Sequence, residues 1–275
     1  MRKSWKKRIL AFMTISALAL LTACGSETSG DGDGDGDGKK TLKVGTDAAF
    51  APFEYMDKGE IVGFDVDFLD AVMKEAGYEY ELKNIGWDPL FAAVQAGNEV
   101  DLAVSGITIN DKRKQTYDFS RPYFESTHMI MFNEGVKIES AQDLKGLKVG
   151  VQNGTTGQAA AEKILGENSS DIMKYENNVV AIMALDQGDV DAVVTDNTVV
   201  NEYVKNNPNK SFLTIEDPEN FESEFYGLMF PKGSDIEEEI SAAIKEVIES
   251  GKYAEIYEEW FGADPNTGIL LEQGE

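Results

Sequence analysis

The 275-residue sequence contains one cysteine, Cys24, and one histidine, His128. It therefore has no internal disulfide framework, no Cys/His zinc site and no catalytic triad built from several such residues. Basic residues are also few, because 25 Lys and Arg stand against 50 Asp and Glu, a formal net charge of −25. That charge repels a phosphate backbone, which excludes nucleic acid as a partner. Acid, amide, hydroxyl and a few basic side chains must carry the chemistry.

One extended apolar run is present, at residues 9–21, behind a basic start and ahead of the small residues Thr22 and Ala23. This order is typical of a secretory signal peptide, residues 1–23. A transmembrane helix is the alternative, but it needs about 20 apolar residues, and this run is shorter and is interrupted by Thr14 and Ser16.

The tetrapeptide at 21–24, Leu-Thr-Ala-Cys, resembles the bacterial lipobox. The resemblance implies that Cys24 is acylated and becomes the first residue of the mature chain, attached to the membrane by its lipid alone. Two acyl chains are enough for stable attachment. Without residues 1–23 the chain has 20 basic residues against 50 acidic ones, so it is strongly acidic.

Residues 24–40 begin with the lipobox cysteine and continue as an Asp/Gly-rich segment without a core-forming pattern, which predicts a flexible tether. Its Asp31-x-Asp33-x-Asp35-Gly36 pattern copies the first half of an EF-hand loop. The twelfth position of that loop needs a bidentate Glu, and Leu42 stands there. We therefore expect no calcium site, and no metal or cofactor elsewhere.

From residue 41 onward, short β-branched runs alternate with helical stretches, the pattern of an α/β fold with parallel strands. Two internal repeats organise it: Leu-Lys-Val-Gly occurs at 42–45 and 147–150, and Val-Asp-x-x-Val occurs at 100–104 and 190–194. These repeats predict two similarly built lobes.

Apolar spacing predicts amphipathic helices that end at Gly77, Gly97 and Gly251. The middle one is expected to start with Asp88 as its cap and Pro89 in its first turn. We assign the apolar stripes of these helices to the core.

Small polar or acidic side chains follow four predicted strands. Ligands bind beyond the carboxyl ends of strands in open α/β sheets, so we predict the site there. The residues are Asp47 and Phe50 after 42–44, Ser105, Gly106 and Thr108 after 100–104, Gln152, Thr155 and Thr156 after 147–151, and Thr195 and Asp196 after 190–194.

Five stretches together resemble the polar amino-acid family of ABC-transporter solute-binding proteins, family 3, and especially its lipoproteins for arginine and other basic amino acids. They are GTDAAFAPF (45–53), GFDVD (63–67), GITINDKR (106–113), DFS (118–120) and YEEWFG (257–262). The resemblance implies a two-lobed periplasmic-binding-protein-like fold of type II, each lobe a sheet flanked by helices. It places lobe 1 at 41–122 and 227–265, lobe 2 at 128–221, hinges at 123–127 and 222–226, and a tail at 266–275.

The resemblance also implies roles in binding. Arg113 would clamp the ligand α-carboxylate through two parallel guanidinium donors, helped by Thr108 and the amides near Thr155 and Thr156. Asp196 would accept the α-ammonium with the backbone around Gly106, and Phe50 and Trp87 would sandwich the ligand side chain. The alternatives stay open on sequence alone: a solvated surface Arg113, helix caps for Thr155 and Asp196, and core packing for the two aromatics.

Relatives that bind glutamine carry a Lys at the position of Gln152, where it neutralises the acid equivalent to Asp47. Gln152 has no charge, so we expect Asp47 to face a cationic ligand side chain. The full predicted ligand-binding set is Asp47, Phe50, Glu54, Trp87, Ser105, Gly106, Thr108, Arg113, Gln152, Thr155, Thr156 and Asp196.

We therefore expect an extracytoplasmic, monomeric, lipid-anchored protein, not an enzyme, that closes on a free basic amino acid and delivers it to an ABC permease. Arginine is the first candidate, followed by lysine, ornithine and histidine. The alternatives are a binding protein for glutamine or another polar amino acid, a cyclohexadienyl-dehydratase-like enzyme on the same fold, and a co-receptor for a sensor kinase.

Overall fold

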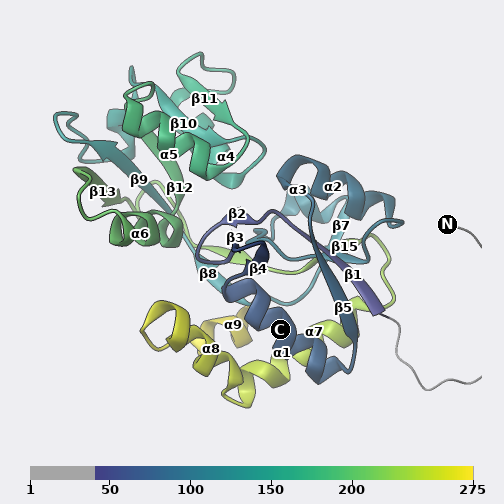
Figure 1. Ribbon diagram of the computed structural model, residues 1–275. Coiled ribbons are helices and arrows are strands. Elements are labelled where there is room, and N and C mark those ends of the chain that lie inside the picture. Colours follow the sequence, from purple (N-terminus) through teal and green to yellow (C-terminus); the bar gives the residue numbers. More distant parts are fainter. Residues whose placement is uncertain (1–40, 275) are drawn as a thin grey trace, which may run out of the picture. The chain divides into compact units, whose positions relative to one another are not determined.

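The computed structural model describes residues 41–274, which form an α/β protein with two sheet-and-helix lobes (Figure 1). The sheet of lobe 1 has the strand order β5-β1-β6-β15-β7. Its strands are β1 (Thr41–Thr46), β5 (Glu79–Asn84), β6 (Leu102–Ala103), β7 (Tyr117–Phe119) and β15 (Met229–Pro231). The sheet of lobe 2 has the order β11-β10-β12-β9-β13. Its strands are β9 (His128–Asn133), β10 (Val149–Gln152), β11 (Ile172–Tyr175), β12 (Ala192–Asp196) and β13 (Phe212–Glu216).

The chain passes between the two sheets along a two-stranded antiparallel ribbon, β8 (Phe124–Ser126) and β14 (Glu224–Tyr226). β8 leads directly into β9, and β14 leads directly into β15. In the two main sheets, β9 and β15 run antiparallel to their neighbours. The parallel pattern read from the sequence holds for β1 with β5 and β6, and for β10 with β11 and β12.

The internal repeats occupy equivalent positions in the two sheets. Val44 pairs with Leu102 in lobe 1, as Val149 pairs with Ala192 in lobe 2. The Asp of each Val-Asp pair accepts a hydrogen bond from the backbone N–H of the repeated Lys, at 2.8 Å in both lobes. Because the two registers match, each lobe presents the carboxyl ends of its central strands at one edge.

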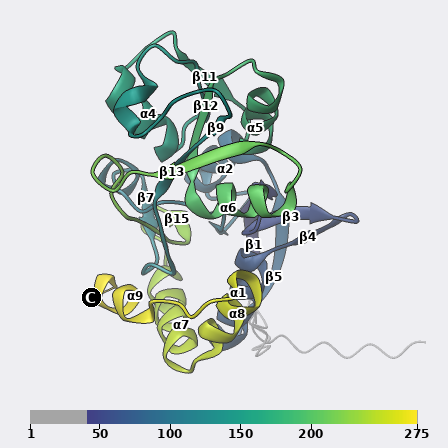
Figure 2. The ribbon, with the colours of Figure 1, turned by 90° about the vertical axis from the view of Figure 1, so that its left-hand side faces the viewer.

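Helices cover the sheets as the apolar spacing predicts. Figures 1 and 2 show α1, α7 and α8 together beside the lobe 1 sheet and α4, α5 and α6 around the lobe 2 sheet. The helices are α1 (Phe64–Ala76), α2 (Trp87–Ala96), α3 (Asp111–Lys114), α4 (Thr156–Leu165), α5 (Asn178–Gln187), α6 (Asn197–Asn206), α7 (Glu237–Glu249), α8 (Lys252–Phe261) and α9 (Thr267–Gln273), with a 3-10 turn at Ala141–Leu144 and a small hairpin sheet of β2 (Ala49–Phe50), β3 (Glu54–Asp57) and β4 (Glu60–Val62).

The helix stops at Gly77 and Gly97 are confirmed, since both glycines adopt the left-handed conformation that ends a helix. The predicted cap of α2 is wrong by two residues. The cap position is Gly86, and the helix begins at Trp87, so Asp88 lies inside the first turn, where its charge favours the positive end of the helix dipole.

Within residues 41–274, no helix combines the length and the apolar character that crossing a membrane would require. The predicted signal peptide, the lipid attachment at Cys24 and the tether lie outside the described residues.

The entry to α1 depends on Gly63. Its φ of 144° and ψ of 175° belong to a region that only glycine occupies readily, and a Cβ there would lie against the carbonyl oxygen of Phe53.

We expect Gly63→Ala to lower the free energy of unfolding by about 3 kcal/mol or more in urea titrations. Gly59→Ala is the matched control, because Gly59 has a φ of 95° but a Cβ there would meet no atom within 4 Å, and the change should cost only about 1 kcal/mol. Equal losses in the two variants would contradict the packing argument.

Candidate ligand-binding site

Eleven of the twelve predicted ligand-binding residues line one cavity between the strand ends of the two sheets. Lobe 1 contributes Asp47, Phe50, Trp87, Ser105, Gly106, Thr108 and Arg113, and lobe 2 contributes Gln152, Thr155, Thr156 and Asp196. Their positions follow from the parallel registers, because β1, β6, β10 and β12 all end at this cavity.

Asp47 is a buried carboxylate that follows β1. Its Oδ2 accepts a hydrogen bond of 3.2 Å from Nε2 of Gln152, whose own carbonyl oxygen accepts one of 2.9 Å from Asn178. Burial raises the pKa of Asp47, and the bond from Gln152 partly opposes that rise. The structure thus brings Gln152 next to Asp47, and no described cation pairs with that carboxylate.

Arg113 is held in the cavity wall by neutral groups. Its guanidinium donates a hydrogen bond of 2.8 Å to the backbone carbonyl of Thr108. Its Cζ lies 5.5 Å from the ring centroid of Trp87 and 5.2 Å from that of Phe91. Burial lowers the pKa of Arg113 to about 10, so it remains charged at neutral pH. Among the described residues no carboxylate lies within ion-pair distance of it. The interpretation of Arg113 as a solvated surface residue is therefore wrong.

Asp196 ends β12 and occupies the cap position of α6, but its side chain makes no capping hydrogen bond. Its Oδ1 instead accepts a hydrogen bond of 3.3 Å from the hydroxyl of Ser126. The pKa of Asp196 is raised, chiefly by burial. The helix-cap explanation thus fails for this side chain. It holds for Thr155, whose hydroxyl accepts 3.2 Å from the amide of Gln158.

Phe50 and Trp87 both line the cavity and pack in the core. Phe50 stacks on Phe53 with ring centroids 5.4 Å apart, and Trp87 meets Phe91 edge to face at 4.8 Å. Gly106 makes room for Phe50, since a Cβ on Gly106, at φ 51°, would lie 2.5 Å from the Phe50 ring. The two proposed roles of these aromatics are compatible.

Glu54 is the one predicted residue that does not line the cavity. It lies on β3, fully buried behind Ser105, whose hydroxyl donates 2.6 Å to Glu54 Oε1. The same Ser105 oxygen accepts 3.0 Å from the backbone N–H of Asp47. Glu54 therefore contacts the cavity lining through Ser105.

Two further polar residues, Glu224 and His128, lie at the edge of the cavity and were not predicted. Glu224 Oε2 accepts 2.9 Å from the hydroxyl of Thr108 and lies 3.9 Å from Nε2 of buried His128. Glu224 falls in the predicted hinge at 222–226, which was the only signal for it. With Asp196 these residues form the one group of metal-ligating atoms, all within 4.8 Å of one another, among residues 41–274. Glu224 is already engaged by Thr108, so we assign no metal to them.

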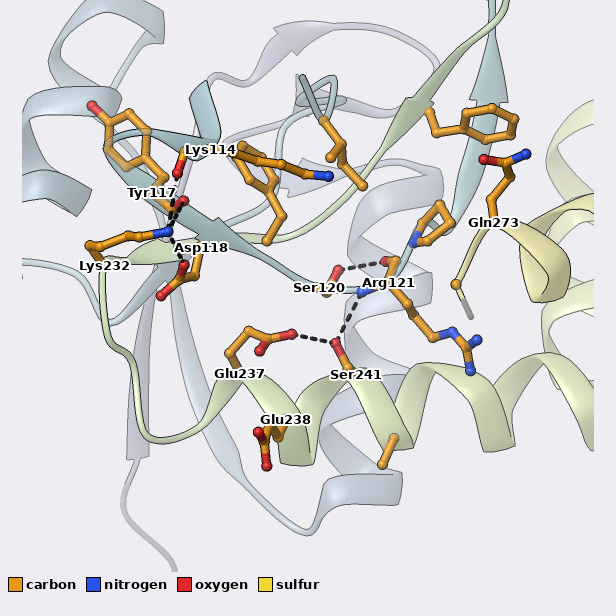
Figure 3. A pocket seen from close by; sticks show the side chains of 16 residues that line it. Lys114, Tyr117, Asp118, Ser120, Arg121, Lys232, Glu237, Glu238, Ser241 and Gln273 are labelled. Carbon is orange, nitrogen blue, oxygen red and sulfur yellow. Dashed lines mark hydrogen bonds and ion pairs between the residues drawn. The ribbon is translucent and has the colours of Figure 1, made fainter. Parts of the chain in front are cut away.

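A second, larger cavity of about 730 Å³ lies between β7 and α7 (Figure 3). Several of its polar groups are already paired: Lys232 forms an ion pair with Asp118 at 2.6 Å, and the hydroxyl of Ser241 donates a 2.7 Å hydrogen bond to Glu237 and accepts one of 3.0 Å from the backbone N–H of Arg121. The guanidinium Nε of Arg121 is buried without a hydrogen-bond partner in the described part of the chain. Paired groups leave few free partners for a ligand. The smaller cavity gathers two carboxylates, one guanidinium and several hydroxyls at the strand ends of both sheets, so it is the better site.

Comparison with known proteins points to one family. Residues 42–263 match the family described as bacterial extracellular solute-binding proteins, family 3. The chain is 40% identical over 264 residues to a probable histidine-binding protein of Neisseria gonorrhoeae, covering 94% of this chain and 97% of that one. It is 32% identical to the arginine-binding extracellular protein ArtP of Bacillus subtilis, covering 93% and 98%.

Among solved structures, the chain resembles the arginine-, lysine-, histidine-binding protein ArtJ of Geobacillus stearothermophilus, with a TM-score of 0.82 and 62% identity over 84% of this chain and all of that one. These relatives are named for binding amino acids, and the chain is likewise a binding protein and not an enzyme. It belongs to family 3 of the bacterial extracellular solute-binding proteins.

Proposed function

We propose that the protein binds one free basic amino acid, arginine in preference to lysine, ornithine and histidine, and delivers it to the permease of an ABC importer. One observation carries the proposal. The cavity is lined by two carboxylates, Asp47 and Asp196, and one guanidinium, Arg113, and none of the three has an ion-pair partner among the described residues.

The charges of a free basic amino acid complement these three groups. Its α-carboxylate matches Arg113, and its α-ammonium matches Asp196, on the opposite lobe. Asp47 then remains for the ligand side chain, which must be cationic to neutralise it. A neutral amino acid would leave Asp47 buried without a charged partner, which is unfavourable. The names of the Neisseria, Bacillus and Geobacillus relatives support the same class of ligand.

Binding by lobe closure follows from where these groups sit. The contacts for one ligand are divided between lobe 1 (41–122 and 227–265) and lobe 2 (128–221), so only a closed arrangement satisfies all of them. The segments at 123–127 and 222–226 would then act as the hinge. They contain β8 and β14, the short ribbon between the sheets.

We further propose that the protein works as a monomer on the outer face of the cytoplasmic membrane, held by a lipid on Cys24 through the tether at 24–40. The lipobox-like sequence supports the anchor, and membership of an extracellular solute-binding family supports the location.

A calorimetric panel of amino acids tests the ligand class directly. Protein freed of copurified amino acid by unfolding and refolding should bind arginine most tightly, then lysine, ornithine and histidine. Glutamine should bind at least about a hundredfold more weakly than arginine, because it leaves Asp47 unpaired, at a cost of about 3 kcal/mol. Preferential binding of glutamine or another neutral amino acid would refute the basic-ligand proposal.

Arg113 and Asp196 are proposed to bind the α-carboxylate and the α-ammonium that all amino acids share. Removing either side chain should therefore weaken every ligand alike. Arg113→Ala and Asp196→Ala each leave a ligand charge desolvated and unpaired, so we expect losses of about 3 to 5 kcal/mol, or more than a hundredfold in Kd. Arg121→Ala and Asp118→Asn are matched controls in the second cavity and should change Kd by less than about threefold. If the two controls weakened binding while Arg113→Ala and Asp196→Ala did not, the ligand would have been assigned to the wrong cavity.

Gln152→Lys should switch the preferred charge of the ligand. With Gln152 Nε2 already 3.2 Å from Asp47, a lysine there can pair with that carboxylate and repel an incoming guanidinium. Arginine affinity should fall by two or more orders of magnitude, while glutamine affinity should fall far less or rise.

Met173→Lys is the matched control for this switch. It adds the same charge to an exposed position of β11, outside the cavity lining, and should leave the preference for arginine over glutamine unchanged. Parallel titrations of both ligands into both variants decide the question. An unchanged preference in Gln152→Lys would show that Gln152 and Asp47 do not set the ligand charge.

A further inference from the structure

Two fully buried carboxyl groups, Glu54 and Asp65, lie directly behind the wall of the cavity. Glu54 Oε1 accepts the 2.6 Å bond from the hydroxyl of Ser105. Asp65 Oδ2 accepts 3.0 Å from the backbone N–H of Gly106 and 2.9 Å from the hydroxyl of Tyr123. The remaining oxygens, Glu54 Oε2 and Asp65 Oδ1, receive no hydrogen bond from any described donor.

No positive group compensates these carboxyls. Within residues 41–274 neither forms an ion pair with a Lys, Arg or His. The titratable groups that face them are Asp47 toward Glu54, and Tyr123 and Tyr253 toward Asp65. Two adjacent, fully buried carboxylates would repel each other strongly, because little solvent screens them.

The two oxygens that have no donor are therefore the ones left for a contact between the two carboxyl groups, and such a contact requires a proton on one of them. Burial and the neighbouring charge of Asp65 raise the pKa of Glu54 well above its usual range. Burial also raises the pKa of Asp65, to about 6, against the opposing bonds from Gly106 and Tyr123. The raised pKa of both groups favours a single proton on the pair, with Asp65, which accepts two other hydrogen bonds, as the charged partner.

We propose that Glu54 and Asp65 share one proton and act as a positioning pair, which makes the end of β6 a row of hydrogen-bond acceptors for the ligand. The hydroxyl proton of Ser105 is directed to Glu54, so its oxygen has only a lone pair left for the cavity. The N–H of Gly106 is directed to Asp65, so Gly106 has only its carbonyl left. This wall therefore suits ammonium and guanidinium groups and disfavours carboxylates.

The choice of ligand in this inference rests on the proposed function, but the shared proton does not. Infrared spectroscopy tests the proton without any ligand. The wild-type protein at neutral pH should show the C=O absorption of a protonated carboxylic acid, and Glu54→Gln should lack it. Asp217→Asn is the matched control. Asp217 is also buried, but hydrogen bonds that include those from the Ala141 and Asn220 amides lower its pKa, so it carries no proton at neutral pH. The absorption should therefore persist in Asp217→Asn. Absence of the absorption in the wild type, or its persistence in Glu54→Gln, would overturn the proposal.

Stability measured against pH provides a second readout. A carboxyl whose pKa is raised on folding binds its proton more tightly in the folded state, so its stabilising contribution is complete below the unfolded pKa and is lost as pH rises toward the folded pKa. Glu54→Gln has no such proton. The quantity to follow is the folding equilibrium constant of Glu54→Gln divided by that of the wild type. This ratio should rise about tenfold per pH unit, from about pH 4.5 upward until Glu54 ionises in the folded wild-type protein. A ratio independent of pH would overturn the shared proton.

Ligand affinity tests the positioning role. Glutamine at position 54 can accept from Ser105 and donate to Asp65, so Glu54→Gln should keep arginine affinity within about threefold. Glu54→Leu removes the acceptor of Ser105, whose hydroxyl can then donate into the cavity, and arginine affinity should fall at least tenfold. Equal losses in the two variants would overturn positioning.

These arms remain separable from one another. If Glu54→Leu does not fold, the Glu54→Gln affinity and the two ligand-free readouts still decide. If the wild type binds no amino acid, the proposed function fails, while the infrared and pH measurements still decide the shared proton.

Discussion

Arg113 and Asp196 are half-buried charges on different lobes, and no protein group of opposite sign neutralises either at ion-pair distance among the described residues. Leaving a charge desolvated costs several kcal/mol, so each depends on weaker local support. Two aromatic faces and the carbonyl of Thr108 hold the guanidinium, and the hydroxyl of Ser126 contacts the carboxylate. Because this support is partial, a zwitterionic ligand gains where the protein alone cannot. Ligand binding is then also expected to stabilise the folded chain by mass action.

The positions of these charges follow from backbone registers rather than from local sequence. The pairing of β1 with β6 is repeated in the pairing of β10 with β12. In each lobe the Asp side chain of the Val-Asp repeat supports this pairing, because it accepts a hydrogen bond from the backbone N–H of the repeated Lys. The carboxyl ends of four strands therefore meet at one cavity. The direct passages from β8 to β9 and from β14 to β15 bring the antiparallel strands in without disturbing these ends.

This regularity explains which parts of the molecule were predictable. Periodicity and repeats reveal strand ends and helix stops, which is why the fold class and the cavity-lining position of Asp47, Gln152 and Asp196 follow from the sequence. The start of α2 was misjudged because an Asp-Pro pair fits a first turn as well as a cap. Contacts made at long range were not predictable. Glu54 sits on a hairpin strand 51 residues away from the Ser105 it contacts, and no local pattern shows that it lies behind the cavity wall rather than in it.

Three buried carboxyl groups, those of Asp47, Glu54 and Asp65, lie near one another in lobe 1, and their surroundings differ. Asp65 receives bonds from Gly106 and Tyr123, and on our proposal a third from the Glu54 proton, so its charge is largely satisfied. The side chain of Asp47 receives a single 3.2 Å bond from a neutral amide, whose orientation Asn178 fixes. A charge-assisted bond is about twice as strong as a neutral one, so the less satisfied carboxylate gains more from a ligand cation. On our proposals, the protein thus retains negative charge in two buried places, and only Asp47, which lines the cavity, is left to attract a cationic ligand side chain.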